Sequence, residues 1–497
     1  MRTSATVIGG PLRPDKTQLA RHRRTAQPDH RVPYTEPMTE HRAAEPAAGG
    51  LDVDADDLRA FLDASPSPFH AVATMTARLA AAGFAALEET TSWRLEPGGA
   101  YYTVRDGGSL VAWRMGTTAP AESGLRLIGT HTDSPTFKVR PRAAEQRHGY
   151  RLVGVEPYGG VLTHTWFDRD LNVAGRVFLD TDEGVQARLV LLTGGPLRIP
   201  SLAIHLDRSV QRDGFRPDPQ RHTVPVEGTQ DDGGTPLLDR IASLVEVEPH
   251  AVLASDLILA DAQPASVTGT SLRSGRLDNL LSCYAALHAL CATPAGPSTQ
   301  LLIANDHEEV GSRTAEGAAG SLLADVVGRL AAVGSATDAD PAALVPAEQV
   351  TRTVRRSLLV SCDAAHALHP NYADRSEPAH EVRFGGGPAL KSNANQAYAT
   401  DAATAAVFSA LCRRADVDVQ HYVSRADLPC GSTIGPITAA RLGLATVDVG
   451  APLLSMHSIR EQADLRDVAP LVRALAAHLA AEPARTPVHR RTPTSPQ

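Results

Sequence analysis

Four short apolar runs of this chain each end in polar side chains of the types that bind metals or carry out catalysis. The runs cover residues 125–129, 300–304, 357–361 and 445–449. Helical apolar spacing accompanies them at residues 280–291, 402–411 and 465–479. Strands that alternate with helices predict an α/β fold with a mostly parallel sheet and helices on both faces. Because ligands bind beyond the carboxyl ends of the strands in such sheets, we expect the polar clusters to form one site.

Residues 140–250 follow a different pattern. Short alternating runs at 150–155, 175–179 and 187–192 are separated by many turn residues, and no long helical pattern occurs. We therefore predict a catalytic α/β domain at 51–139 and 251–482, split by an inserted β-rich domain at 140–250. The end segments, 1–50 and 483–497, have no periodic apolar face and are predicted to be disordered.

The composition narrows the class of partner. A formal net charge of -8 argues against nucleic acid, because proteins that bind it concentrate basic charge. The five cysteines include no Cys-x-x-Cys pair, which indicates reduced thiols rather than a disulfide framework or a thiolate zinc site. No stretch approaches the roughly 20 apolar residues that cross a bilayer, and the first residues lack the apolar core of a secretory signal. We expect a cytoplasmic protein with no nucleic-acid or membrane partner.

Two of the polar clusters each allow a structural and a functional interpretation. His131 and Asp133 are two positions apart, so in extended chain both side chains leave the same side, where the carboxylate can orient a metal-binding imidazole. An isolated pair of this kind is more commonly ordinary loop chemistry. Asp278 precedes an apolar helix and is either a helix cap or a carboxylate shared by two metal ions.

The adjacent carboxylates Glu308 and Glu309 are the most specific local signal. Both follow an apolar strand directly, where they repel each other and lose solvation. Metal binding by one would compensate that cost and leave the other as a general base, whereas the alternative is a solvated acidic turn. Asp363 and His457 follow the other two runs and could complete the ligand set, although each alone is more readily a turn aspartate or a satisfied loop histidine.

Together these positions meet the requirements of two-metal hydrolysis. That chemistry needs one bridging carboxylate, further ligands for each ion, and a free carboxylate as base. The pattern supplies one histidine and one unshared carboxylate for each ion around a shared aspartate. Such ligands suit zinc, with manganese or cobalt as alternatives, better than copper or an iron–sulfur cluster.

Longer motifs extend this pattern to a known family. They are Gly129–Pro135 (GTHTDSP), Val155–Gly160 (VEPYGG), His164–Asp170 (HTWFDRD), Asp306–Ser312 (DHEEVGS), Ala365–Tyr372 (AHALHPNY) and Met456–Glu461 (MHSIRE). On these motifs the chain resembles the aspartyl aminopeptidase family, within the clan of bridged di-zinc exopeptidases. The resemblance covers nearly everything from Leu58 to Ala480.

The resemblance implies two zinc ions per subunit and roles for individual residues. One ion would be bound by His131, Asp278 and Asp363, and the other by Asp278, Glu309 and His457. Glu308 would be the general base, and Asp133 the outer partner of a metal ligand. Substrate contacts would come from His164, His366, Lys391 and Tyr398.

The resemblance also implies an assembly. The inserted domain would mediate dimerisation and carry His164 to the active site of a neighbouring subunit. Members of the family typically form large tetrahedral dodecamers with enclosed active sites. We therefore expect a homo-oligomer built from dimers, with peptides as its substrates.

The expected activity is removal of N-terminal residues, preferably Asp or Glu, from peptides. Lys391 begins a match to the family pattern Lys-x-Asn-x-Asn-Gln and could pair with an acidic side chain or with a peptide carbonyl. The family pattern has arginine after Gln396, where this chain has Ala397, and the lost charge weakens the expectation of a strict acidic preference. The alternatives are an aminopeptidase of neutral or broad specificity, a carboxypeptidase or N-acyl deacylase, and a non-enzymatic shell or cargo protein.

Overall fold

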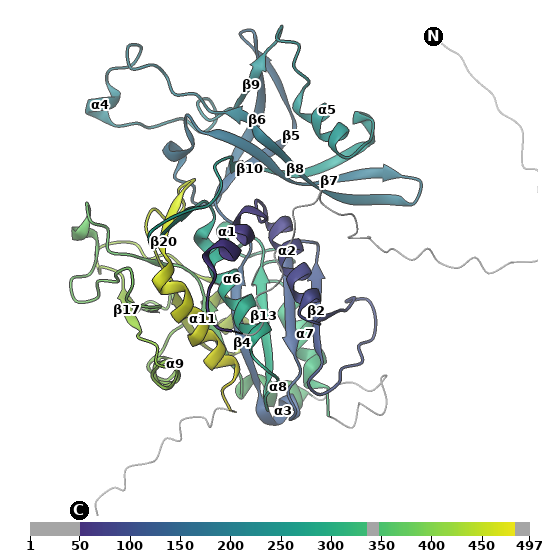
Figure 1. The fold of residues 1–497 in the computed structure, drawn as a ribbon, viewed down its shortest axis with the longest axis vertical. Coiled ribbons are helices and arrows are strands. Elements are labelled where there is room, and N and C mark those ends of the chain that lie inside the picture. Colours follow the sequence, from purple (N-terminus) through teal and green to yellow (C-terminus); the bar gives the residue numbers. More distant parts are fainter. Residues whose placement is uncertain (1–49, 335–346, 483–497) are drawn as a thin grey trace, which may run out of the picture. The chain divides into compact units, whose positions relative to one another are not determined.

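The computed structural model describes residues 50–334 and 347–482 (Figure 1). The predicted disordered segments, apart from Gly50, lie outside the described residues. The largest sheet within them has nine strands in the order β1-β2-β3-β13-β4-β14-β18-β16-β17. In that order the strands are Ala85–Ala86, Ala100–Arg105, Ser109–Arg114, Thr299–Asn305, Leu125–His131, Leu358–Cys362, Ala445–Gly450, Ala389–Ser392 and Gln420–Val423. The neighbours β13, β4, β14 and β18 run parallel, which confirms the predicted mostly parallel sheet.

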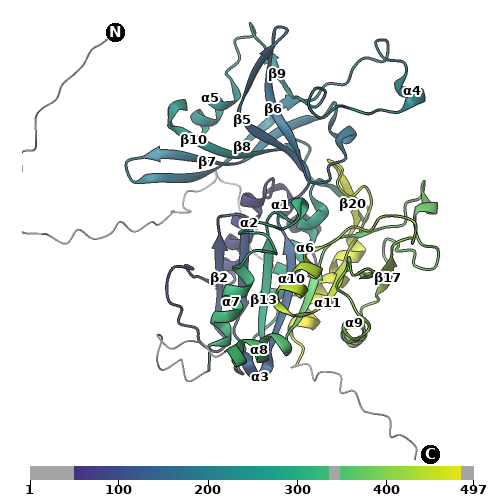
Figure 2. The ribbon, with the colours of Figure 1, turned by 180° about the vertical axis from the view of Figure 1, so that it is seen from behind.

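Helices cover both faces of this sheet. Successive side chains of each strand point to opposite faces, so both faces carry apolar side chains that must be buried. In β13, Leu301 and Ile303 pack into one apolar cluster, whereas Leu302 and Ala304 pack into another. The cluster around Leu302 includes residues of α1 (Ala55–Asp63), α2 (Pro68–Ala81), α6 (Leu277–Ala292), α9 (Ala402–Arg414) and α11 (Leu465–Leu479). The cluster around Leu301 includes residues of α7 (Leu322–Ala331), α8 (Ala347–Arg355) and α10 (Ile434–Leu442). Figures 1 and 2 show members of the two groups in front of the sheet from opposite sides.

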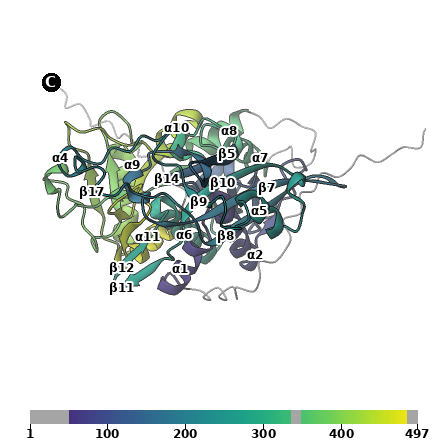
Figure 3. The same cartoon turned by 90° about the horizontal axis from the view of Figure 1, so that it is seen from above.

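The other long strands form a closed barrel in the order β10-β5-β6-β9-β8-β7 (Figure 3). In that order they are Val252–Asp261, Thr136–Arg147, Tyr150–Tyr158, Val226–Thr229, Gly184–Arg198 and Asp170–Thr181. Phe137, Val177 and Leu257 are fully buried in its apolar core, to which helix α5 (Leu237–Leu244) adds Leu237 and Ile241. The barrel strands extend beyond the predicted insertion at 140–250, because β10 pairs with both β7 and β5.

Smaller elements complete the described ranges. They are β11 (Ser266–Thr268), β12 (Ser271–Ser274) and β20 (Glu461–Asp464) in one sheet, β15 (Ala365–His366) and β19 (Pro452–Leu453) in another, and the short helices α3 (Pro120–Ser123) and α4 (Val210–Asp213). The cysteines at positions 283, 291, 362, 412 and 430 are all unpaired. Of the helices in the described ranges, none combines the length and the apolar character that a membrane crossing needs.

His478 makes the stability of this fold sensitive to pH. It lies fully buried on α11, where its Nε2 donates a hydrogen bond of 3.0 Å to the carbonyl oxygen of Leu127 on β4. Burial lowers the pKa of His478 to about 3, and the nearby Arg126 adds to the fall. Below its ordinary pKa of 6.5 the unfolded chain protonates this imidazole while the folded chain does not. The contribution of His478 to stability is therefore present above pH 6.5 and is lost as the pH falls towards the folded pKa.

We expect the variant His478→Gln, which keeps a donor but does not titrate, to lose this dependence. Below about pH 6.5, the free energy of unfolding of the unmodified chain should fall more steeply than that of the variant, by about 1.4 kcal/mol per pH unit. Urea denaturation of both chains at several pH values measures the difference in slope. Parallel curves would show that His478 is not held neutral by the fold.

Candidate metal centre

Three of the five predicted ligands lie at or just beyond the carboxyl ends of strands in the nine-stranded sheet. His131 is the last residue of β4, Asp363 follows β14 directly, and Glu309 lies in a short 3₁₀ turn after β13. Because β13, β4 and β14 are adjacent and parallel, their carboxyl ends meet at one edge of the sheet. Asp278 lies in the first turn of α6, and His457 follows β19.

Asp278 lies between the two histidines. Its Oδ1 is 3.4 Å from His131 Nε2, and its Oδ2 is 3.3 Å from His457 Nε2. His131 Nε2 is also 3.4 Å from Asp363 Oδ1, and His457 Nε2 is 3.6 Å from Glu309 Oε2. The five predicted ligands thus come together in two groups that share Asp278. The helix-cap interpretation of this residue fails, because among the described residues no backbone N–H of α6 donates to its carboxylate: Oδ1 is buried without a hydrogen-bond partner and Oδ2 faces His457.

These donor atoms fit a divalent metal ion such as zinc. Tetrahedral zinc with bonds of about 2.0–2.2 Å places neighbouring ligand atoms roughly 3.4 Å apart. The separations across the two groups are 3.3 to 3.6 Å. Asp278 Oδ1 and Glu309 Oε1 are buried without a hydrogen-bond partner, a cost that a bound cation removes. The donor set of imidazole and carboxylate therefore suits zinc in its chemistry as well as in its spacing.

Asp133 supports this centre from outside. The Nδ1 of His131 is 3.1 Å from the carbonyl oxygen of Asp133, which can only accept, so Nδ1 carries the proton and Nε2 presents its lone pair. The fully buried Asp133 carboxylate accepts the backbone N–H groups of Glu308 and Glu309, both at 3.1 Å. It also accepts the hydroxyl of Tyr158 at 2.7 Å. Asp133 therefore orients a histidine through its backbone carbonyl and fixes the turn of the adjacent carboxylates through its side chain.

Glu308 has the properties of a proton carrier near neutral pH. Burial raises the pKa of Glu308 to about 7, with the carboxylates of Asp363 and Asp133 adding to the rise and His131 opposing it. Burial and the charge of Asp278 raise the pKa of the neighbouring Glu309 well above its usual range. A general base is most effective when its pKa lies close to the working pH, so Glu308 can serve as one.

Comparison with known proteins decides the family. The model of the aminopeptidase I zinc metalloprotease family, M18, matches residues 61–478. This chain belongs to the M18 family. It is a zinc metalloaminopeptidase, a hydrolase that acts on peptide bonds.

Curated relatives and solved structures agree with this family. A probable M18 family aminopeptidase 2 of Pseudomonas syringae pv. tomato is 44% identical over 428 residues, covering 84% of this chain and 96% of its own length. A chain in the cryo-EM structure of the Ape4 and Nbr1 complex is 34% identical, with a TM-score of 0.81, covering 86% of this chain and 85% of that chain. The S. cerevisiae mApe1 dodecamer is 30% identical, with a TM-score of 0.72, covering 85% of this chain and 95% of that chain.

In this M18 chain the barrel contributes to the centre through a glycine pair after β6. The carbonyl oxygen of Gly160 lies 3.2 Å from His457 Nδ1, so it accepts the proton of that nitrogen and leaves Nε2 free towards Asp278. A Cβ atom on Gly160 would come within 3.0 Å of the same imidazole nitrogen. Gly159 has a φ of +68°, and a Cβ there would lie 3.0 Å from Glu309 Cβ. Gly159 therefore requires glycine, and a side chain at position 160 would displace the imidazole of His457.

The variant Gly159→Ala tests this contact. We expect it to weaken zinc binding by about tenfold or more, because the new methyl group would displace Glu309. Gly149→Ala is the matched control, since Gly149 also has a left-handed φ of +83° but an added Cβ would meet nothing within 4 Å. Zinc affinity measured by competition with a chelator should fall only in the first variant. Equal affinities in the two variants would contradict the role of the close approach.

Three of the four predicted substrate contacts lie near the predicted metal ligands. Lys391 is buried, with its Nζ 3.5 Å from Asp363 Oδ2, 3.1 Å from the carbonyl oxygen of Ala364 and 4.9 Å from the centre of the Tyr398 ring. Tyr398 and His366 both pack against Tyr422, with ring centres 6.2 and 5.8 Å apart. These side chains form one wall beside Asp363. His164 differs, because it is exposed in the 3₁₀ turn Thr163–Trp166 and contacts no predicted ligand among the described residues.

Two groups at the centre, the half-buried Tyr158 and the buried Glu461, were missed by sequence reasoning. Tyr158 bonds to Asp133, as described above, and Glu461 accepts the backbone N–H groups of Asp278 and His457. Both residues lie inside motifs that carried the family resemblance, and that membership was the available signal. Nothing local marks them, because the partners of Tyr158 and one partner of Glu461 are distant in the sequence.

Proposed function

We propose that this chain is a two-metal aminopeptidase that prefers peptides with an acidic first residue. The observation that carries the proposal is the position of Asp278, whose two oxygens each face a different imidazole at 3.4 and 3.3 Å. A carboxylate in this position suits a bridge between two ions. His131 and Asp363 would complete one ion's ligands, and Glu309 and His457 the other's.

The mechanism we infer assigns proton transfer to Glu308. When bound, the metal ions polarise the scissile carbonyl and acidify the attacking water. Glu308 accepts a proton from that water on its carboxylate and later delivers the proton to the leaving amine. A pKa of about 7, raised by burial, supports this double role near neutral pH. Asp133 holds Glu308 in place through the backbone N–H bond of 3.1 Å.

Recognition of the acidic residue is proposed for Lys391. Its ammonium group lies 3.5 Å from Asp363, and Tyr398 and His366 belong to the same wall of side chains. A buried cation attracts a carboxylate strongly, because little water screens it. Ala397 replaces the arginine of the family pattern and removes a second positive charge. We therefore propose a graded preference for Asp and Glu over neutral residues rather than a strict one.

We further propose that the chain works as a dodecamer built from dimers. The solved S. cerevisiae mApe1 is a dodecamer. In the loop after β8 the residues Leu202 and Leu206 are 62% and 74% exposed to solvent. Large apolar side chains that are exposed together are typical of a surface that a partner covers. Dimerisation through the barrel would explain why His164 is exposed here, since the resemblance places it in a neighbouring active site.

Hydrolysis of a small substrate panel tests the proposal. The substrates are aspartyl, glutamyl and leucyl peptides with a free amine, together with the same peptides blocked by an acetyl group. We expect cleavage of the free peptides only, with kcat/KM higher for the acidic residues. Equal cleavage of blocked peptides would indicate an N-acyl deacylase, release of C-terminal residues would indicate a carboxypeptidase, and protein that neither binds nor responds to added zinc, manganese or cobalt would indicate a shell protein.

A further inference from the structure

Glu461 joins the two chain segments that carry Asp278 and His457. It is the first residue of β20 and is only 2% exposed. Its Oε2 accepts the backbone N–H of Asp278 at 3.0 Å, and its Oε1 accepts the backbone N–H of His457 at 2.7 Å. Both carboxylate oxygens are therefore engaged by backbone donors.

A buried carboxylate lowers the stability of the fold, because it loses its solvation by water. Such a group is usually paired with a cation, because transfer of a charge out of water costs several kcal/mol. The partners of Glu461 are instead two N–H groups, and each belongs to a residue that faces the metal centre. Their shared location suggests that the carboxylate serves the centre and not only the local fold.

We infer that Glu461 is a positioning residue that sets the separation between Asp278 and His457 and thereby the affinity for the ion held by Asp278, Glu309 and His457. The inference rests on the proposed function, because it assumes two ions that share Asp278. It parallels the role of Asp133, whose carboxylate accepts the N–H groups of Glu308 and Glu309.

The backbone at His457 supports this role. Its φ is +68°, a left-handed conformation that is unfavourable for residues other than glycine. The conformation directs the imidazole towards Asp278, where Nε2 reaches a carboxylate oxygen at 3.3 Å. The short hydrogen bond from the His457 N–H to Glu461 offsets part of this strain.

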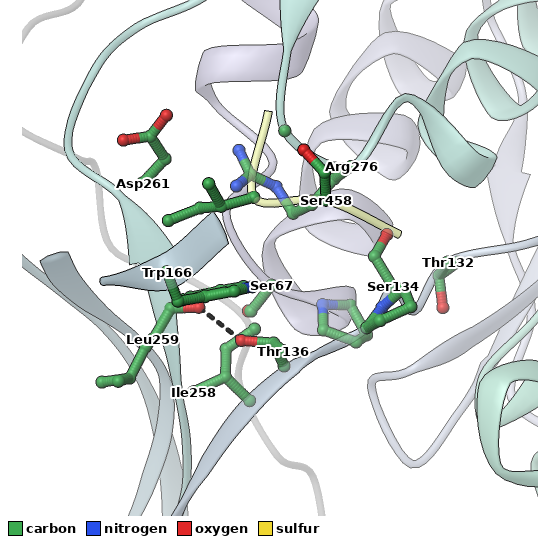
Figure 4. A pocket seen from close by; sticks show the side chains of 14 residues that line it. Ser67, Thr132, Ser134, Thr136, Trp166, Ile258, Leu259, Asp261, Arg276 and Ser458 are labelled. Carbon is green, nitrogen blue, oxygen red and sulfur yellow. Dashed lines mark hydrogen bonds between the residues drawn. The ribbon is translucent and has the colours of Figure 1, made fainter. Parts of the chain in front are cut away.

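A small cavity borders the segments that carry His131, Asp278 and His457. It has a volume of about 20 Å³ and is lined by Thr132, Arg276 and Ser458 among others (Figure 4). Each of the three is a near neighbour in sequence of one predicted ligand: Thr132 of His131, Arg276 of Asp278 and Ser458 of His457. The cavity has room for about one water molecule, so the packing is incomplete on this side of the segments. A hydrogen-bonded tie such as Glu461 can fix the separation that the packing leaves open.

The variant Glu461→Gln tests the inference on the full-length chain. The amide keeps one oxygen acceptor but turns an NH₂ group towards the second N–H donor, so one tie is broken. We expect one of the two zinc ions to bind about 10–100-fold more weakly while the other keeps its affinity. Zinc per chain, measured by elemental analysis across a series of zinc buffers, gives both affinities without a measurement of activity.

Two further variants make the result specific. Glu461→Asp keeps the charge but is one methylene shorter, so it reaches one N–H and should weaken the same ion. Asp467→Asn is the matched control, because Asp467 is 1% exposed and accepts the N–H groups of Gly385 and Gly387 at 2.9 and 2.8 Å. This control should lower the stability to urea while both zinc affinities stay unchanged. Circular dichroism of each variant confirms that it is folded.

The outcomes separate the inference from the proposed function. Selective weakening of one ion in both Glu461 variants supports the positioning role. Unchanged affinities, or equal weakening of both ions, would overturn it even though the unmodified chain binds two. If the unmodified chain itself holds fewer than two zinc ions at saturation, the two-metal proposal fails, and the positioning role fails with it.

Discussion

Replacement of Glu308 by glutamine is expected to leave the zinc content unchanged and to reduce kcat by about 100- to 10,000-fold, the usual contribution of a positioned general base. Glutamine has the size of glutamate but cannot accept the proton of the attacking water. The backbone N–H of residue 308 would still bond to Asp133, so the turn should keep its shape. Steady-state kinetics on an aspartyl peptide, together with elemental analysis of the same protein, measures both quantities.

The adjacent residue provides the control for this prediction. Glu309→Gln changes the neighbouring carboxylate by the same single group, and its side chain lies 3.6 Å from His457 Nε2. This variant should lose zinc as well as activity, because it removes a proposed ligand. Near-normal turnover in Glu308→Gln would show that another group carries the proton. Loss of zinc in Glu308→Gln would instead indicate that Glu308 is a metal ligand and Glu309 the general base.

Replacement of Asp278 by asparagine is expected to have the broadest effect, because this residue is the proposed shared ligand. An amide offers one weak oxygen in place of two charged ones, so both ions should bind more weakly and activity should be lost. The metal-free chain should lose part of its stability as well, because the imidazoles of His131 and His457 outweigh burial and hold the pKa of the Asp278 carboxyl well below its usual range.

Thermal unfolding with and without zinc distinguishes this effect from misfolding. Zinc that binds only the folded state raises the unfolding temperature of the unmodified chain, with the increase set by its affinity. In Asp278→Asn we expect that increase to be largely abolished, while the unfolding temperature in chelator falls but the chain still unfolds in one cooperative transition. A variant that retains the full zinc-dependent increase would show that Asp278 is not a ligand.

Much of the catalytic fold follows from local sequence patterns. The helical spacing at 465–479 predicts a helix that the structure contains with the same bounds. The polar clusters after the apolar runs predict an edge of the sheet at which His131, Glu309 and Asp363 meet. These features are predictable because burial imposes the period of each element and parallel strands end at the same edge.

The remaining features depend on contacts between distant segments. β10 completes the barrel only by pairing with β7 and β5, and no local pattern at 252–261 specifies those partners. Gly160 contacts His457 through its backbone carbonyl, and the Glu461 carboxylate binds the backbone N–H groups of Asp278 and His457. Backbone groups carry no signal of residue type. The alternative of a helix cap for Asp278 likewise required coordinates, since the two roles call for the same residue in front of the same helix.

The central claim is that two metal ions share Asp278, and anomalous diffraction from crystals of the zinc-loaded chain tests it most directly. Difference maps at the zinc absorption edge should show two peaks, one between Asp278, His131 and Asp363 and the other between Asp278, Glu309 and His457. A single peak at saturating zinc, or two peaks of which only one contacts Asp278, would contradict the account.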